Sequence, residues 1–260
     1  MGGGGVKIFK VGYCTQIEKF ACKTSPFKKV KFWACAFLIK IPGHGNVLVD
    51  TGYGTHFFEA TARFPYRLYR FLTPVKLEKD LRSQLKGEKI DYVVVTHFHP
   101  DHIGGLKDFQ NSKWIYSAKG YAKMKALKGF KALREGMIPG LLPKSVPLGS
   151  MEIEEKEEKV FPFSPDFPSV DLFGDGSLFV FELPGHAIGQ LGVAFRRGKK
   201  WTLLVADAAW SGQALKEGIL PSYFGLKMQH DCAVYQETFW KLHKLTSNND
   251  HIEVIATHGE

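Results

Sequence analysis

Cysteine is scarce in this sequence, and no hydrophobic stretch is long. The 260 residues include four cysteines (Cys14, Cys22, Cys35 and Cys232), and no two of them have the C-x-x-C spacing of a zinc ribbon or a redox motif. The longest apolar run, around residues 34–39, is far shorter than the ~20 residues that a membrane-spanning helix needs. We therefore exclude a disulfide-stapled miniprotein and predict no membrane-spanning segment.

The sequence also has no unusually high or low content of hydrophobic or charged residues. Hydrophobic residues make up 44% and charged residues 23% of the chain, which excludes a disordered or collagen-like protein. No linker or internal repeat divides the sequence, so we expect one domain over residues 1–260, with residues 1–5 (M-G-G-G-G) disordered or left over from cloning. The N-terminus lacks the basic and apolar regions of a secretory signal, and we therefore expect a cytoplasmic protein.

The chain carries more positive than negative charge, with a net charge of +9. Such a balance is compatible with a nucleic acid, an anionic membrane surface or an anionic substrate as partner. The lysines are scattered, and the densest basic stretches are residues 23–31 and 119–134. We interpret them as a solvated surface and expect no membrane partner, with nucleic acid and a homodimer as open alternatives.

Strand patterns dominate both halves of the chain, with helices between them. Residues 32–41 and 47–50 predict an antiparallel hairpin, and Thr73-Pro74 predicts the start of a helix that continues to about Lys86. A helix over 231–245 is expected to be capped by Asp231. Further strands are predicted over residues 90–95, 114–116, 177–183, 191–195, 201–206 and 252–257. The mixture indicates an α+β protein in which sheets pack together with helices outside.

The most informative segment is T-H-F-H-P-D-H-I-G-G at residues 96–105. Three histidines and one aspartate fall within six positions, directly after a predicted buried strand. Because side chains alternate along an extended chain, His97 and His99 are expected to point the same way and to bind one metal ion. Asp101 and His102 can face a second ion, since zinc and its neighbours accept imidazole nitrogen and carboxylate oxygen. We call residues 97–102 the histidine loop.

Three further candidate ligands follow predicted strands elsewhere in the chain. They are His186, after Leu183-Pro184-Gly185, then Asp207, after strand 201–206, and His258, after strand 252–257. Each alone is also typical of a capping or exposed residue, but strand ends that project loops to one edge are where sites are usually built. Together with the histidine loop they would complete seven ligands for two metal ions.

The H-x-H-x-D-H loop, with Asp50-Thr51-Gly52 upstream and His186, Asp207 and His258 downstream, resembles the metallo-β-lactamase superfamily. The resemblance covers residues 32–258. It implies a four-layer αββα sandwich, with two mostly antiparallel sheets, helices outside and a dinuclear site at one edge.

Within this superfamily, the sequence is most similar to the N-acyl homoserine lactonase group. The similarity lies in V-G-Y-C at 11–14, A-C-A-F-L-I at 34–39, V-L-V-D-T-G at 47–52, and D-L-F-G-D-G-S at 171–177, which leads into L-P-G-H-A-I-G-Q at 183–190. It implies a hydrolase that opens a cyclic ester, such as an N-acyl homoserine lactone, through a hydroxide that bridges two metal ions. Zinc is the expected metal, and iron, manganese and cobalt are alternatives.

The resemblance also implies a role for each ligand. His97, His99 and His186 would hold one ion, and Asp101, His102 and His258 the other. Asp207 would bridge both, while Asp50 would orient a ligand histidine without touching the metal. Asp101, with Asp207, is a catalytic candidate because it can supply the proton that the leaving alkoxide needs.

The substrate-binding residues are less well defined by sequence. The lactonases are expected to have a tyrosine three residues after the bridging aspartate, and this chain has Trp210 there. Phe64, Tyr66 and Tyr223 are candidates for the wall of an acyl-chain site, although an aromatic and basic stretch is also typical of a helix packed on the sandwich. Alternative functions are a phosphodiesterase or RNA-processing nuclease of the same superfamily, and a metal-binding or ligand-sensing module without catalysis.

Overall fold

The computed structural model describes residues 5–156, 159–247 and 249–258. The chain divides into two units, each with its own sheet and helices. The N-terminal unit consists of Val6–Thr15 and Lys31–Glu152, and the C-terminal unit contains Gln16–Val30 and the chain from Ile153 onward. Of the segment expected to be disordered, residues 1–4 lie outside the described residues, and Gly5 is exposed. The single domain over residues 1–260 stays a prediction.

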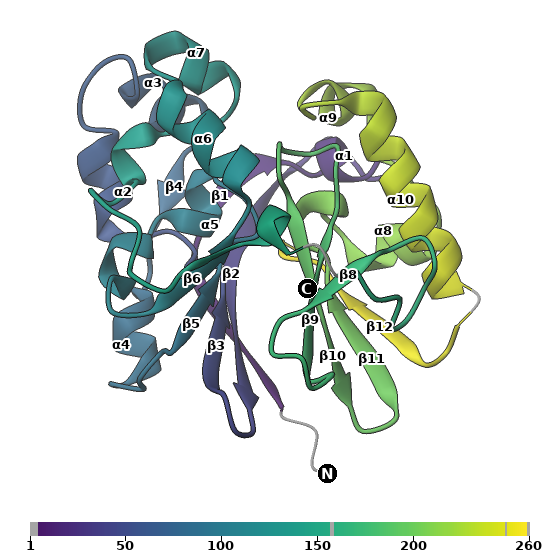
Figure 1. Ribbon diagram of the computed structural model, residues 1–260. Coiled ribbons are helices and arrows are strands. Elements are labelled where there is room, and N and C mark those ends of the chain that lie inside the picture. Colours follow the sequence, from purple (N-terminus) through teal and green to yellow (C-terminus); the bar gives the residue numbers. More distant parts are fainter. Residues whose placement is uncertain (1–4, 157–158, 248, 259–260) are drawn as a thin grey trace. The chain divides into compact units, whose positions relative to one another are not determined.

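A seven-stranded mixed sheet forms the framework of the N-terminal unit, in the order β4-β1-β2-β3-β5-β6-β7 (Figure 1). Strands β2 and β3 form the predicted hairpin, in which Phe37 pairs with Val49. Strands β3, β5, β6 and β7 run parallel to one another, so this sheet is mixed and not mostly antiparallel as predicted. The bounds are β1 Val6–Ile17, β2 Lys29–Ile41, β3 Gly45–Val49, β4 Val75–Lys76, β5 Tyr92–Val94, β6 Lys113–Tyr116 and β7 Met151–Glu152.

Short helices accompany this sheet and complete its core. Phe57 and Met124, from two of the helices, are fully buried in one cluster with Val93 and Leu48 from the strands. The apolar side of the sheet is therefore covered by helical side chains, as the apolar strand patterns require. The bounds are α2 Thr55–Ala60, α3 Arg67–Leu72, α4 Leu81–Leu85, α5 Pro100–Ile103, α6 Ala118–Ala126 and α7 Gly129–Arg134, with 3-10 turns at Leu106–Phe109 and Pro139–Leu141.

The helix predicted from Thr73 to about Lys86 is wrong over its first half. Val75 instead pairs with Cys14, so that Val75–Lys76 forms the edge strand β4. The helix begins only at Leu81, where the Asp80 side chain accepts a hydrogen bond from the Ser83 backbone N–H at 2.9 Å. Strand pairing and a stronger N-cap at Asp80 thus override the Thr-Pro start signal.

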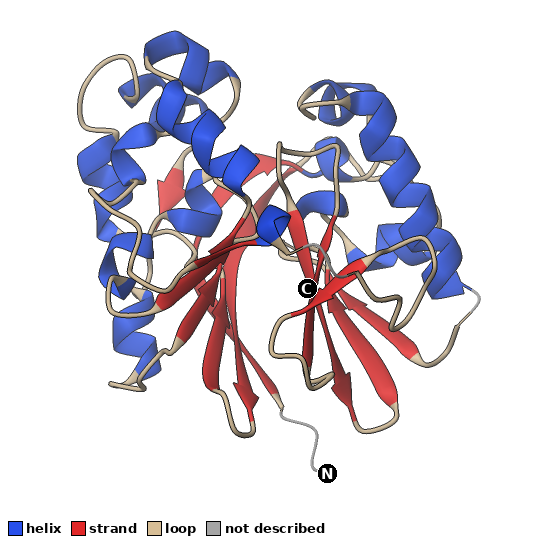
Figure 2. Ribbon diagram, viewed as in Figure 1, coloured by secondary structure: helices blue, strands red, loops and turns tan. Residues whose placement is uncertain are grey.

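The C-terminal unit is built on a five-stranded sheet in the order β12-β11-β10-β9-β8 (Figure 2). Its core contains Phe181, Leu203 and Val254 from three strands and Phe239 from the longest helix. The strands are β8 Ser169–Asp171, β9 Leu178–Glu182, β10 Leu191–Arg197, β11 Lys200–Leu204 and β12 Ile252–Ile255. The helices are α1 Glu18–Ala21, α8 Gly212–Lys216, α9 Tyr223–Lys227 and α10 Cys232–Ser247, with 3-10 turns at Ile153–Glu155 and Ala206–Ala208.

The predicted cap of the long helix is confirmed. The Asp231 carboxylate accepts hydrogen bonds from the backbone N–H groups of Ala233 and Val234, both at 3.0 Å. These bonds satisfy donors that the first turn of a helix leaves free. Among the helices of the described residues, none is long and apolar enough to cross a bilayer.

Strand direction decides where the candidate ligands lie within each unit. In the C-terminal unit, β11 is parallel to β12, and β9 and β11 are each antiparallel to β10. Strands β9, β11 and β12 therefore end at the same edge, and His186, Asp207 and His258 follow those three ends. In the N-terminal unit, β3 and β5 are parallel, so that Asp50 and the histidine loop likewise follow neighbouring strand ends. Such edges collect side chains from distant parts of the sequence.

Candidate metal centre

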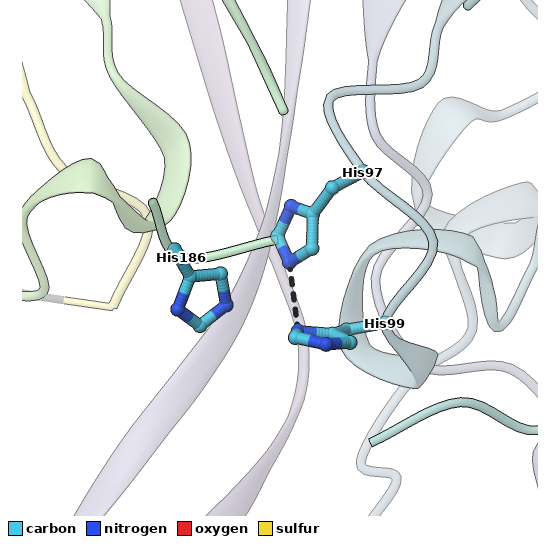
Figure 3. A group of neighbouring side chains, drawn as sticks. All are labelled: His97, His99 and His186. Atoms are coloured by element: carbon cyan, nitrogen blue, oxygen red, sulfur yellow. Dashed lines mark hydrogen bonds between the residues drawn. The ribbon is translucent and has the colours of Figure 1, made fainter. Parts of the chain in front are cut away.

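The histidine loop connects β5 to α5 in the N-terminal unit. His97 and His102 are completely buried, and His99 is the residue that precedes the first turn of α5. His97 Nε2 lies 3.0 Å from His99 Nδ1, as the dashed line in Figure 3 shows. Ligand atoms of Asp101 and His102 also lie within 4.8 Å of each other. The structure thus brings together the four loop residues in the two pairs that the sequence predicted.

Asp50 holds the ring of His102. Its Oδ2 lies 2.7 Å from His102 Nδ1, and its carboxylate also accepts hydrogen bonds from the Thr96 backbone N–H and hydroxyl. Because a carboxylate accepts, Nδ1 of His102 carries the proton and Nε2 is left with a lone pair for a metal. Asp50 lies where a residue that orients a ligand would be expected, and it has a left-handed backbone with φ of 58°.

The ring of His99 is held through Nε2, whereas that of His102 is held through Nδ1. Nε2 of His99 donates to the backbone carbonyl of Glu135 at 3.1 Å, which leaves Nδ1 with the lone pair. Gly136 lies against the same ring, where a Cβ would approach Nε2 to 3.1 Å. The segment after α7 therefore packs closely against the His99 ring and holds it in place. The sequence did not predict this contact, because any residue type can supply a backbone carbonyl.

The C-terminal unit supplies a second cluster around Asp207. Its Oδ2 lies 3.3 Å from His186 Nε2 and 3.2 Å from His258 Nε2. The indole N–H of Trp210 donates to the same oxygen at 3.1 Å. Asp207 is only 4% exposed and follows Ala206, whose φ is 47°. The three predicted ligands of this unit therefore meet at one carboxylate.

His186 is positioned by α10 and by Gln229. Its Nδ1 lies 2.7 Å from Gln229 Oε1, and the Gln229 amide N–H donates to the Gly225 carbonyl at 2.9 Å, which fixes which end of the amide faces the ring. Nδ1 of His186 thus carries the proton, and Nε2 faces Asp207. Gly185 has φ of 122° and lies against the backbone of Tyr235 on α10, so a side chain there would collide. Gln229 was not predicted, since it lies 43 residues from its partner.

The predicted substrate contacts occupy varied environments. Trp210 is half-buried, with its ring centroid 5.9 Å from that of His186. The Tyr66 hydroxyl accepts a hydrogen bond from the Gly129 N–H at 2.8 Å, and its ring packs on the core of the N-terminal unit. Phe64 and Tyr223 are 69% and 67% exposed. The indole N–H of Trp210 therefore already bonds Asp207, whereas the rings of Phe64 and Tyr223 expose apolar surface to solvent.

The donor groups of each unit fit divalent metal ions. The N-terminal unit offers three imidazoles and one carboxylate and the C-terminal unit two imidazoles and one carboxylate, and the rings of His99, His102 and His186 each have one nitrogen held by an oxygen acceptor. That arrangement fixes each tautomer so that the remaining nitrogen presents its lone pair. Imidazole and carboxylate ligands suit zinc, iron, manganese and cobalt.

The thiols near the histidine loop do not offer an alternative nucleophile. Burial raises the pKa of the Cys35 thiol to about 11, and Cys14 is buried as well. A thiol with such a pKa is almost entirely protonated near neutrality and is a poor nucleophile. Cys14 and Cys35 thus behave as small apolar core residues, as the sequence indicated.

Comparison with known proteins identifies the family. The model of the metallo-β-lactamase superfamily matches residues 35–231 of the chain. The chain belongs to the metallo-β-lactamase superfamily. The predicted membership is thereby confirmed, and with it the α+β sandwich fold. This superfamily member is 29% identical over 184 residues to a probable metallo-hydrolase, Rv2300c, of Mycobacterium tuberculosis, a match that covers 67% of the chain and 56% of the relative.

Further relatives and solved structures extend the likeness. A gamma-lactamase, MBL2, of Gibberella moniliformis is 25% identical over 127 residues, which cover 47% of the chain and 52% of that protein. The chain thus spans about half the length of these curated relatives. An AiiA variant from B. thuringiensis with N-decanoyl-L-homoserine bound has a TM-score of 0.71 at 15% identity, covering 100% of this chain and 94% of that one. AidC, a dizinc quorum-quenching lactonase, has a TM-score of 0.60 at 16% identity, covering 98% and 91%. These structures share the superfamily fold.

Replacing Asp50 with asparagine is expected to lower metal affinity by about 10- to 100-fold, since partners that orient ligand histidines have effects of this size. The change keeps the shape of the side chain but removes the charge that faces His102 Nδ1. Competition titrations with a chromophoric zinc chelator measure the affinity. Asp91→Asn is the control, because Asp91 also accepts a backbone hydrogen bond, from Asn46, and is paired with Lys89 outside the ligand set. Equal zinc affinities for the Asp50 variant and the unaltered chain would contradict the orienting role.

Proposed function

We propose that the protein is a metal-dependent hydrolase that opens a lactone, with an N-acyl homoserine lactone or a similar cyclic ester as substrate. The observation that carries the proposal is the set of candidate ligand rings at the strand ends of each unit, in which Asp50, Gln229 and the Glu135 carbonyl define the nitrogen that would bind a metal. Sites that have lost their function have no reason to keep such a set intact. We also keep the cytoplasmic location as part of this proposal.

The two ligand clusters together would hold two divalent ions, with zinc as the first candidate. In this proposal His97, His99 and His186 would hold one ion, and Asp101, His102 and His258 would hold the other. Asp207 would be the ligand that both share, in keeping with its contacts to both His186 and His258. A pair of divalent ions supplies a water molecule with a lowered pKa and a Lewis acid for the substrate carbonyl.

The protein side chains then orient the site and move the proton. Asp101 is partly exposed at the start of α5, where its carboxyl group can deliver a proton to the alkoxide that leaves as the ring opens. Asp207 keeps its orientation through the indole N–H of Trp210. The rings of His99, His102 and His186 each keep a proton on the nitrogen that an oxygen acceptor holds, so that the other nitrogen could ligate an ion.

Four aromatic residues are proposed to contact the substrate. The Trp210 ring would form a wall beside the reacting carbonyl, while its N–H stays on Asp207. Phe64, Tyr66 and Tyr223 would cover an acyl chain, since rings with free apolar surface gain from such burial. Support also comes from two solved structures of similar fold, one with N-decanoyl-L-homoserine at its active site and one with the product N-hexanoyl-L-homoserine at its catalytic metal centre.

The test is turnover of a substrate panel by the metal-loaded protein. The panel contains N-acyl homoserine lactones of several chain lengths, an unsubstituted butyrolactone, a γ-lactam and bis-p-nitrophenyl phosphate, and proton release reports ring opening. A kcat/KM of ~10⁴ M⁻¹s⁻¹ or more for a lactone supports the proposal. Turnover of the phosphodiester alone would favour the nuclease alternative. The net charge of +9 is compatible with that alternative, because nucleic acids are anionic. Two bound metals without any turnover would favour the sensing module.

A further inference from the structure

The most unusual surface outside the ligand clusters lies over α3, α6 and α7 of the N-terminal unit. Residues 60–77 and 111–134, which contain these helices, hold eleven of the chain's 35 Lys and Arg residues and none of its 26 Asp and Glu residues. The two segments touch, since the Phe64 and Phe130 rings are 5.5 Å apart and the Gly129 N–H donates to the Tyr66 hydroxyl. Figure 1 shows α3, α6 and α7 gathered together. We call the exposed side chains of residues 63–72 and 125–134 the α3–α7 face.

Large apolar side chains stand in solvent on the α3–α7 face. Phe71 is 79% exposed, Leu72 71%, Phe64 69% and Phe130 60%, and no residue of α3 is buried. Single exposed apolar residues are common on folded proteins, but a group of them marks a surface that binds something. The tyrosines of the same segment behave differently, because Tyr66 and Tyr69 pack against the core. The segment thus uses its tyrosines to fold and leaves its phenylalanines outside.

Basic side chains occur in the same two segments as these apolar groups. Arg63, Arg67, Lys128 and Lys131 are all exposed. Lys123, farther along α6, pairs with Glu135 just beyond the acid-free segment, at 3.4 Å. A partner for this face must therefore be anionic and must also offer an apolar layer.

We propose that the α3–α7 face binds the surface of an anionic phospholipid bilayer. Phenylalanine and leucine side chains enter the boundary between headgroups and acyl chains, while lysine and arginine attract the anionic headgroups. An RNA would satisfy the cations and could stack on phenylalanine, but it offers nothing apolar to Leu72. A second copy of the chain would place one strongly positive face against another. The exposed apolar groups thus change our interpretation of this basic stretch, which from sequence was a solvated surface without a membrane partner.

The test is co-sedimentation of the full chain with lipid vesicles, which needs no catalytic activity. One set of vesicles contains phosphatidylcholine alone, and the other contains added phosphatidylglycerol. We expect at least about tenfold tighter binding to the anionic vesicles at low salt, since each cation near such a surface contributes to attraction, and a loss of this difference at high salt. Equal binding to both sets of vesicles, or no binding to either, would overturn the proposal.

Two double variants separate the contributions of the apolar and the basic side chains to vesicle binding. Phe71→Ser with Phe130→Ser is expected to lower binding to anionic vesicles by about tenfold or more, because it removes the inserting groups. Lys128→Gln with Lys131→Gln should lower both the affinity and its salt dependence. The matched control, Leu148→Ser with Lys144→Gln, changes a 99% exposed leucine and an exposed lysine elsewhere in the same unit and should bind like the unaltered chain.

Two outcomes of these variants count against a bilayer. If the phenylalanine variant binds vesicles as well as the unaltered chain, the attraction is electrostatic only and the proposal fails. If a single-stranded RNA oligonucleotide binds the unaltered chain more tightly than the anionic vesicles do, the face is a nucleic-acid site instead. Far-UV circular dichroism of each variant verifies that the helices are retained, so that lost binding is not lost folding.

Discussion

An Asp207→Asn variant is expected to lose about 10³-fold or more in kcat/KM for the best lactone of the panel, since metal-assisted steps contribute several kcal/mol and each 1.36 kcal/mol is tenfold in rate. Asp207 is the point where His186, His258 and Trp210 meet in the C-terminal unit. Asparagine keeps the volume but offers one acceptor oxygen instead of two, together with an N–H₂ group that repels a cation. We expect the variant to bind fewer than two metal ions per chain, as measured by elemental analysis after dialysis.

Asp171→Asn is a suitable control for this variant. Asp171 is also a carboxylate of the C-terminal unit, and it accepts hydrogen bonds from the backbone N–H groups of Phe173, Gly174 and Gly176 in the turn after β8. Its replacement is expected to change thermal stability but to leave metal content and kcat/KM nearly unaltered. An Asp207 variant that keeps two metals and full turnover would show that this residue does not bridge the ions.

Removal of metal by a chelator is expected to abolish hydrolysis and to lower the melting temperature. Ions that bind only the folded protein stabilise it by about 2.7 kcal/mol at a free concentration of a hundred times Kd, which corresponds to roughly 5–10 °C for a chain of this size. The effect should be large here because the ligand rings are buried and have fixed tautomers, so the apoprotein keeps polar groups away from water. Differential scanning fluorimetry and proton release measure the two quantities on the same samples.

Restoration of the stripped protein identifies the metal. Zinc, manganese, cobalt and iron(II) are added singly, and the ion that restores both the melting temperature and the turnover is the candidate for the native one. If the chelated protein keeps its activity while elemental analysis shows no metal, a metal-dependent mechanism is wrong. If the melting temperature recovers with metal but no substrate turns over, the ligand clusters bind ions and the lactone assignment fails instead.

The candidate ligand set could be picked out from the sequence because metal binding depends on particular residue types. Histidine and aspartate are uncommon enough that three histidines and an aspartate within the histidine loop stand out, and the strand-end positions of His186 and Asp207 follow from hydrophobic patterns. The groups that orient the rings were only partly predictable. Asp50 follows a strand and belongs to a motif, whereas Gln229 is an ordinary glutamine of a connecting segment, and Glu135 contributes only its backbone.

Secondary structure was predicted correctly where the hydrophobic pattern was clear. It was predicted wrongly where a helix-start signal competed with strand pairing. The hairpin of β2 and β3 and the capped helix α10 agree with their patterns. The stretch after Thr73 carries a genuine helix-start signal, but Val75 gains more by pairing with Cys14 at the sheet edge. The exposure of Phe71 could not be derived either, because whether a phenylalanine points inward depends on how its short helix packs, not on its neighbours in sequence.

Two residues of the ligand region, Asp50 and Ala206, have backbones in the left-handed region, with φ of 58° and 47°. Such conformations cost on the order of 1–3 kcal/mol each for residues other than glycine and persist where the surrounding structure over-determines them. At Ala206 no side-chain hydrogen bond stands against a change to glycine, so a library screened only for heat resistance should accumulate glycine there. At Asp50 the same change would also remove the carboxylate that accepts from Thr96 and faces His102, and the buried donors left behind would offset the relief of strain. Stability therefore favours glycine at position 206 but aspartate at position 50.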